Sequence, residues 1–84
     1  MKSINLPEMK LVRITWLDSN YSPGWNNKHR LTASIPSVTS IGYVTYCDKK
    51  ILELASSIGD EGARLNPLSV AWSSVIELKE INGD

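Results

Sequence analysis

The sequence has a single cysteine, Cys47, and a single histidine, His29, among its 84 residues. One cysteine cannot close an internal disulfide, and one His with one Cys cannot supply the four ligands of a structural zinc site. The simplest interpretation of Cys47 is a small buried hydrophobic side chain in a reducing compartment. We therefore predict no disulfide, no metal and no other cofactor.

An excess of charge and long apolar runs are also missing. Nine basic and nine acidic residues give a formal net charge of zero, which argues against a protein that follows long nucleic acid through many phosphate contacts. No segment approaches the roughly 20 apolar residues of a membrane span, and the first ten residues contain no signal-like run. We expect a cytoplasmic protein whose partners include neither a membrane nor long nucleic acid.

Sequence motifs of catalysis are absent as well. The chain contains no Gly-x-Ser-x-Gly elbow, phosphate-binding loop, dinucleotide-binding glycine motif or HExxH. Its one adjacent acidic pair, Asp60-Glu61, lies between two glycines, where a solvated turn is a better explanation than acid–base chemistry. We predict no enzymatic activity and no catalytic residue.

The patterning that is present is typical of a small β domain. Period-two alternation over 10–17 and β-branched and aromatic residues over 38–46 predict two strands, the second bent at Gly42. Shorter strands are expected over 68–72 and 75–81, separated by a tight, single-turn helical break. The segment 50–56 fits a strand, but a helix over 49–58 is an alternative with a similar apolar pattern. The predicted domain covers 10–81, between a leader at 1–9 and a tail at 82–84.

Apolar residues on one face of these strands are predicted to form the core. They are Val12, Ile14, Trp16, Val44, Leu52, Leu54, Val70 and Ile76, and Trp72 is also expected to face inward. The leader is expected to be dispensable. Because such a small core rarely supplies more than about 3–5 kcal/mol and no disulfide or metal adds to it, we expect a homo-oligomer.

Two polar segments, 18–30 and 56–67, are predicted to be loops. The first reads DSNYSPGWNNKHR, and loops of this length in compact domains are usually functional or disordered. Its rings, amides and cations are groups that a nucleotide pocket requires. The candidate ligand-binding residues are Tyr21, Trp25, Asn27, Lys28, His29 and Arg30, joined by Arg64 of the second loop if the two loops meet. The alternative is that Trp25 anchors the loop to the domain while the cations are solvated.

Five short motifs carry a resemblance across residues 10–81. They are Trp16-x-Asp18-Ser19, Gly24-Trp25, Ile41-Gly42-Tyr43-Val44, SIGDEG at 57–62 and VIELKEI at 75–81. This set resembles a group of short proteins encoded by bacteriophages and prophages, most of undefined function. Residues 71–74 read AWSS, where that group has an Ile-Pro-Lys-Ser-like turn. The resemblance implies a phage origin and favours a strand over a helix at 50–56.

The fold expected from these observations is mainly β, a five-stranded and strongly bent barrel of Sm or Tudor type. An α+β sheet with a helix over 49–58 is the alternative. The leading functional hypothesis is a phage-encoded, non-catalytic binding protein that acts in the host cytoplasm and counters host defence by sequestering a small nucleotide signal. The rivals are an inhibitor or adaptor that binds a host protein, and a minor structural component of the virion.

Overall fold

The computed structural model describes residues 1–18 and 36–82, and this part of the chain is mainly β. Its elements, in chain order, are β1 (Leu11–Leu17), β2 (Ser37–Cys47), β3 (Ile51–Ala55), β4 (Ser57–Ile58), β5 (Arg64–Leu65), β6 (Leu68–Ala71), the 3-10 helix η2 (Trp72–Ser74) and β7 (Val75–Glu80). The predicted helical break before the last strand is therefore confirmed as η2.

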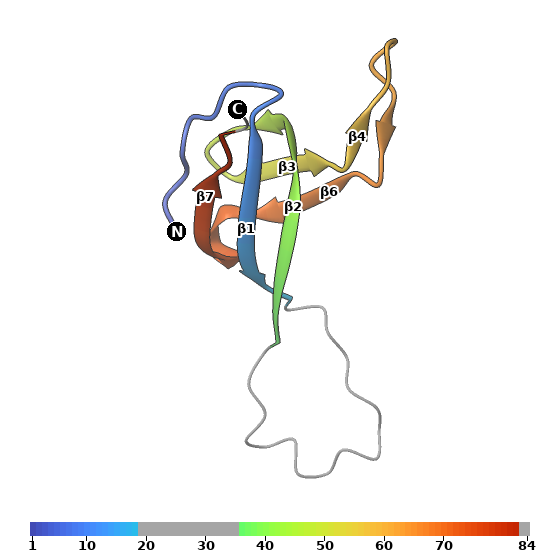
Figure 1. Cartoon of the computed structure of the whole chain (residues 1–84). Coiled ribbons are helices and arrows are strands. Elements are labelled where there is room, and N and C mark those ends of the chain that lie inside the picture. Colours follow the sequence, from blue (N-terminus) through green and yellow to red (C-terminus); the bar gives the residue numbers. More distant parts are fainter. Residues whose placement is uncertain (19–35, 83–84) are drawn as a thin grey trace, which may run out of the picture.

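Five of the strands form one antiparallel sheet in the order β6-β3-β2-β1-β7 (Figure 1). The segment 50–56, for which helix and strand were both considered, contains β3, which pairs with β2 on one side and β6 on the other. The prediction of a mainly β fold is confirmed. The expected barrel is not, because the described strands form a sheet and no closed barrel is found among them.

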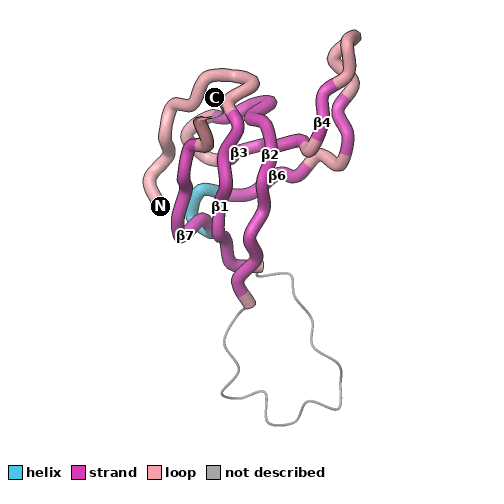
Figure 2. The backbone as a smooth tube through the Cα atoms, viewed as in Figure 1, coloured by secondary structure: helices cyan, strands magenta, loops and turns pink. Residues whose placement is uncertain are grey.

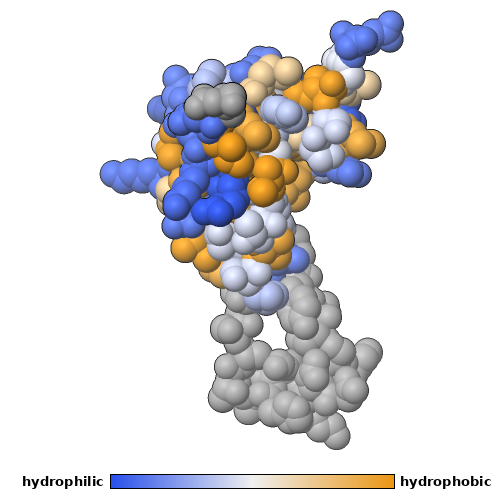
Figure 3. Space-filling model, viewed as in Figure 1, coloured by the Kyte–Doolittle hydropathy of each residue, from blue (hydrophilic) through white to orange (hydrophobic). Residues whose placement is uncertain are grey.

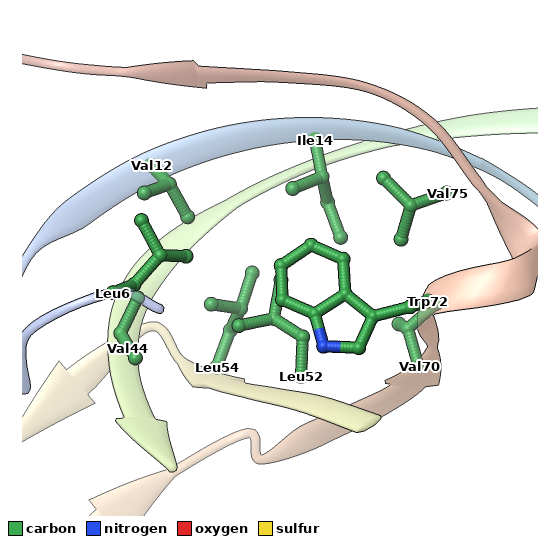
Figure 4. Close-up of a cluster of buried hydrophobic side chains, with 9 residues drawn as sticks. All are labelled: Leu6, Val12, Ile14, Val44, Leu52, Leu54, Val70, Trp72 and Val75. Carbon is green, nitrogen blue, oxygen red and sulfur yellow. The ribbon is translucent and has the colours of Figure 1, made fainter. Parts of the chain in front are cut away.

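The core lies on the inner face of the sheet and is centred on the indole ring of Trp72 (Figure 4). Six of the eight predicted core residues are buried: Val12, Ile14, Val44, Leu52, Leu54 and Val70. Trp72 is buried as expected, and its indole N–H donates to the carbonyl oxygen of Asp48 at 2.8 Å. Burying the ring therefore leaves its one polar group satisfied.

Of the two remaining core predictions, Ile76 is wrong, and Trp16 is confirmed in part because its partly buried side chain packs against the core. Ile76 is 53% exposed, because the register shifts between Thr15 and Trp16 so that Val75 takes the inward position opposite Trp16. Trp16 itself is only half-buried, and its indole N–H donates to the hydroxyl of Ser40 at 3.0 Å. A bulge changes which residues of a strand face inward, and simple alternation along the sequence misses it.

The leader is laid across the domain and contributes to the core (Figure 2). Leu6 is buried at 6% exposure among the core side chains. The amino group of Met1 donates to the carbonyls of Trp72 and Val75, and the N–H of Met9 donates to the carbonyl of Val44 at 2.7 Å. The leader, which the sequence predicts to be dispensable, thus has an apolar anchor in the core and hydrogen bonds at both ends.

The second polar segment, 56–67, is not simply a loop. It contains β4 and β5, which pair Ser57 with Leu65 and Ile58 with Arg64 in a two-stranded ribbon that projects from the sheet (Figure 1). The ribbon turns at Gly62, whose φ of 84° lies in the left-handed region that glycine adopts without strain. The polar residues that suggested a loop are those of its tip.

The turn between β2 and β3 is organised by Asp48. Its carboxylate accepts hydrogen bonds from the backbone N–H groups of Ile51 and Lys50 and from the hydroxyl of Tyr46. These bonds hold the pKa of Asp48 below its ordinary value, and the contact with Asp48 raises the pKa of Tyr46. Asp48 is thus the local reason why the chain reverses here.

Candidate functional site: the open edge of β2

The strand β2 changes partner along its length. On one side it pairs with β1 from Ser37 to Tyr43, and on the other side it pairs with β3 from Tyr43 to Cys47. We call residues 43–47 the closed half and residues 37–42 the open half, because no other described strand pairs with the second side of residues 37–42. In Figure 1 the open half continues past β3 and β6, beside β1 alone.

The backbone groups that face this open side can be assigned from the hydrogen bonds at the two ends of the β1–β2 ladder. Asp18 N–H donates to the carbonyl of Pro36, and Val44 N–H donates to the carbonyl of Lys10. Bonded and non-bonded pairs alternate in an antiparallel ladder, so the even-numbered residues of the open half bond to β1. The N–H and C=O groups of Ser37, Thr39 and Ile41 therefore point away from β1, toward the open side.

The open half begins where β3 leaves the sheet. After Ala55 the chain enters the ribbon, and the N–H of Ser56 bonds to the carbonyl of Leu65 instead of to β2. Gly42 allows the close approach of β2 and β3 just before this divergence, since a Cβ at that position would lie 2.9 Å from the carbonyl oxygen of Ala55. Gly42, where the sequence predicts a bend, thus lies at the boundary between the two halves.

A pocket of about 260 Å³ lies next to the open half. It is lined by residues of β2, of the end of β3 and of the segment that leads into β6: Ser40, Ile41, Leu54, Ala55, Ser56, Asn66 and Leu68. Small-molecule sites commonly enclose about 300–1,000 Å³, so this pocket is better matched to a side chain than to a nucleotide. On the face shown in Figure 3, apolar atoms gather at the base of the ribbon while its tip is hydrophilic.

Among the described strands, β6, β7 and the open half of β2 each have an edge with no strand partner, and these edges differ in how they are protected. The strand β6 has only four residues, follows Pro67 and ends in η2. The strand β7 carries Glu77, Lys79 and Glu80, and its Val75 carbonyl already accepts a hydrogen bond from Met1. Short length, proline and charge are the usual devices against edge-to-edge pairing. The open half of β2 reads SVTSIG, with no charge and no proline, and Ile41 is 58% exposed.

Most of the predicted ligand-binding residues lie outside the described part of the chain. These are Tyr21, Trp25, Asn27, Lys28, His29 and Arg30. The seventh, Arg64, lies on β5 and forms an ion pair of 2.7 Å with Glu53 of β3. Glu53 also accepts hydrogen bonds from the hydroxyls of Thr45 and Ser69. Arg64 therefore helps to attach the ribbon to the sheet.

A second pocket lies away from the open half. A pocket of about 420 Å³ between the leader and the β2–β3 turn is lined by Ile4, Cys47 and Lys49 among others. Within residues 1–18 and 36–82, no three His, Cys, Asp or Glu side chains are grouped to hold a metal ion. The same residues contain no helix long and apolar enough to cross a membrane.

Comparison with known proteins adds no relative. No protein-family model, curated protein or solved structure matches this chain.

Proposed function

We propose that this protein is a non-catalytic binding protein that takes up an extended polypeptide segment by strand addition along the open half of β2. The observation that carries the proposal is the set of backbone groups on Ser37, Thr39 and Ile41 that face away from β1 and that no described strand pairs. In strand addition, main-chain hydrogen bonds supply affinity and pockets for alternate side chains supply specificity. The pocket formed by Ser40, Leu54 and Leu68 lies where such a side chain would be received.

This proposal corresponds to the inhibitor or adaptor hypothesis from the sequence. A phage-encoded protein that binds a host polypeptide in the cytoplasm would need no catalytic group and little beyond an accessible strand edge. Sequestration of a small nucleotide by residues 21–30 remains a separate prediction, and the size of the pocket beside β2 favours the polypeptide. A strongly bent barrel of Sm or Tudor type is part of the proposal, supported by the strand order and by the one-turn helix between β6 and β7.

The test removes one edge donor and leaves the fold intact. In Thr39→Pro the lost N–H is one that points to the open side, and proline is tolerated on a strand edge in that orientation. The matched control Thr39→Val keeps the N–H and the β-branched shape. In contrast, Ser40→Pro removes a bond to β1 and is expected to lower the melting temperature strongly.

The probe is an N-acetylated, C-amidated heptapeptide of alternating threonine and valine, titrated into isotope-labelled protein. We expect the amide resonances of Ser37, Thr39 and Ile41 to shift and to gain protection from hydrogen exchange. Thr39→Pro should weaken binding about tenfold or more, because each net hydrogen bond contributes about 0.5–1.5 kcal/mol and the ring also hinders approach. Unchanged resonances of these three amides at saturating peptide, or equal affinity of the two Thr39 variants, would refute the proposal.

A further inference from the structure

We propose that a second copy of this chain covers the open half of β2, with the two β2 strands paired antiparallel about a two-fold axis at Thr39. The dimer would form through the open half of β2, the same edge that the proposed function requires. In the absence of another partner, β2 of the second copy would occupy this edge. This pairing also gives the predicted homo-oligomer a defined interface. The argument comes from the register, from the side chains on each face, and from the protection of the other edges.

The register is self-complementary. The edge donors and acceptors lie on Ser37, Thr39 and Ile41, which are evenly spaced around Thr39. An antiparallel two-fold pairing places Thr39 opposite the second copy's Thr39, and Ser37 opposite the second copy's Ile41. Each of these pairs joins residues whose N–H and C=O groups both face the edge, as a hydrogen-bonded antiparallel pair requires. All three open residues of each copy are thereby satisfied.

The side chains on the inner face are complementary as well. Val38 and Ser40 pair with Trp16 and Ile14 of β1, so both point to the inner face. The two-fold register places the second copy's Val38 directly opposite Ser40, in a non-hydrogen-bonded pair where side chains approach most closely. Ser40 lines the pocket of about 260 Å³, together with Leu54 and Leu68. The pocket of each copy thus receives an aliphatic side chain from the other.

The side chains on the outer face are also compatible with this two-fold pairing. Thr39 meets the second copy's Thr39, a cross-strand pair that contributes favourably in sheets. Ile41, 58% exposed in the single chain, gains cover beside the second copy's Ser37. No charged residue occurs in 37–42, so no like charges meet across the axis. Because the pairing is isologous, each open half is covered by the other and no open half is left to bind a third copy. Assembly therefore stops at the dimer, and continued edge-to-edge association is prevented.

Cysteine cross-linking tests the axis directly. In a Cys47→Ser background, Thr39→Cys places two thiols at the two-fold, where Cα atoms of a bonded pair lie about 5.5 Å apart, within disulfide range. The matched control is Thr15→Cys, since Thr15 lies opposite Thr39 on the same outer face of β1. Its two copies would be three strand spacings apart, about 14 Å, which is too far for a disulfide.

Under mild oxidation we expect the Thr39→Cys protein to form a covalent dimer and the Thr15→Cys protein to stay monomeric. Sedimentation from micromolar to millimolar concentration should show a dimer for wild type and Thr39→Val, and a folded monomer for Thr39→Pro. Equal cross-linking of both cysteine variants, or a wild-type monomer over the whole range, would overturn the inference.

Failure of this inference can be told apart from failure of the proposed function. A monomer whose Ser37, Thr39 and Ile41 amides respond to the heptapeptide would disprove the dimer and leave strand addition standing. A cross-linkable dimer that excess heptapeptide neither binds nor dissociates would disprove the proposed function and leave the two-fold pairing standing.

Discussion

The two halves of β2 belong to one strand and have opposite relations to the rest of the molecule. In the closed half, Val44 is 1% exposed, β3 pairs on one side, and the leader bonds to the Val44 carbonyl. In the open half, Ile41 is 58% exposed and only β1 pairs with the strand. The closed half therefore holds the fold together, while the open half offers the same hydrogen-bonding pattern to another chain.

The largest difference in stability is expected between alanine substitutions of two tryptophans, Trp72 in the core and Trp16 beside the open half. Trp72→Ala removes a ring that is 2% exposed and packs among the core side chains, and it should lower the free energy of unfolding by about 3–5 kcal/mol. Trp16→Ala removes a half-buried ring beside the open half and should lower it by about 1–2 kcal/mol. Chemical denaturation of both variants measures the difference. Equal losses would show that the open half contributes to the core as much as the closed half does.

A smaller but clear effect is expected from the leader, which bonds to the closed half at Val44 and places Leu6 in the core. Leu6→Ala deletes a side chain that is 6% exposed and should cost about 2–4 kcal/mol. Ile4 is 36% exposed, so Ile4→Ala is the matched control and should change the melting temperature little. If Leu6→Ala melts like the wild type, the leader is as dispensable as the sequence suggested.

The smallest of these effects is expected at the boundary between the halves. Gly42→Ala would bring a Cβ to 2.9 Å from the Ala55 carbonyl oxygen and 3.1 Å from the Leu54 Cβ, and should cost about 1–3 kcal/mol through overpacking. At Gly59 the nearest atom would lie at an ordinary 3.5 Å, so Gly59→Ala should be nearly neutral. Thermal melts of the two variants compare them, and an equally tolerant Gly42 would mean that β3 can move away from β2 freely.

Local patterns in the sequence predicted those elements that depend on neighbouring residues. The alternation of Val12 and Ile14 and the helical break before the last strand were both found, whereas the bend at Gly42 stays a prediction. The ambiguity over 50–56 was resolved by pairing with β2 and β6, a long-range property that periodicity does not contain. The open half could have been noticed as an uncharged run with β-branched residues, but its lack of a second partner depends on where β3 turns away.

The wrong expectations also have identifiable physical causes. Ile76 was placed inward by simple alternation, and the bulge opposite Trp16 gives that position to Val75. Leu6 stands alone in a segment without periodicity, so nothing local marks it as a core residue. The segment 56–67 looked like a loop because its tip residues are polar, although Ser57 pairs with Leu65. The candidate residues between Tyr21 and Arg30 lie outside the described residues, and their role stays a prediction.

Cys47 lies where its reactivity can report on the attachment of the leader. Its sulfur lies 3.6 Å from the carbonyl oxygen of Leu6 and 3.8 Å from that of Ile4, at the end of β2 remote from Thr39. The thiol is half-buried beside the leader, and detachment of the leader exposes it further, so an increase in the rate of alkylation reports detachment. A label attached there leaves the open half untouched. In one sample, the alkylation rate of Cys47 can therefore follow detachment of the leader at one end of β2 while the open half at the other end is titrated with peptide.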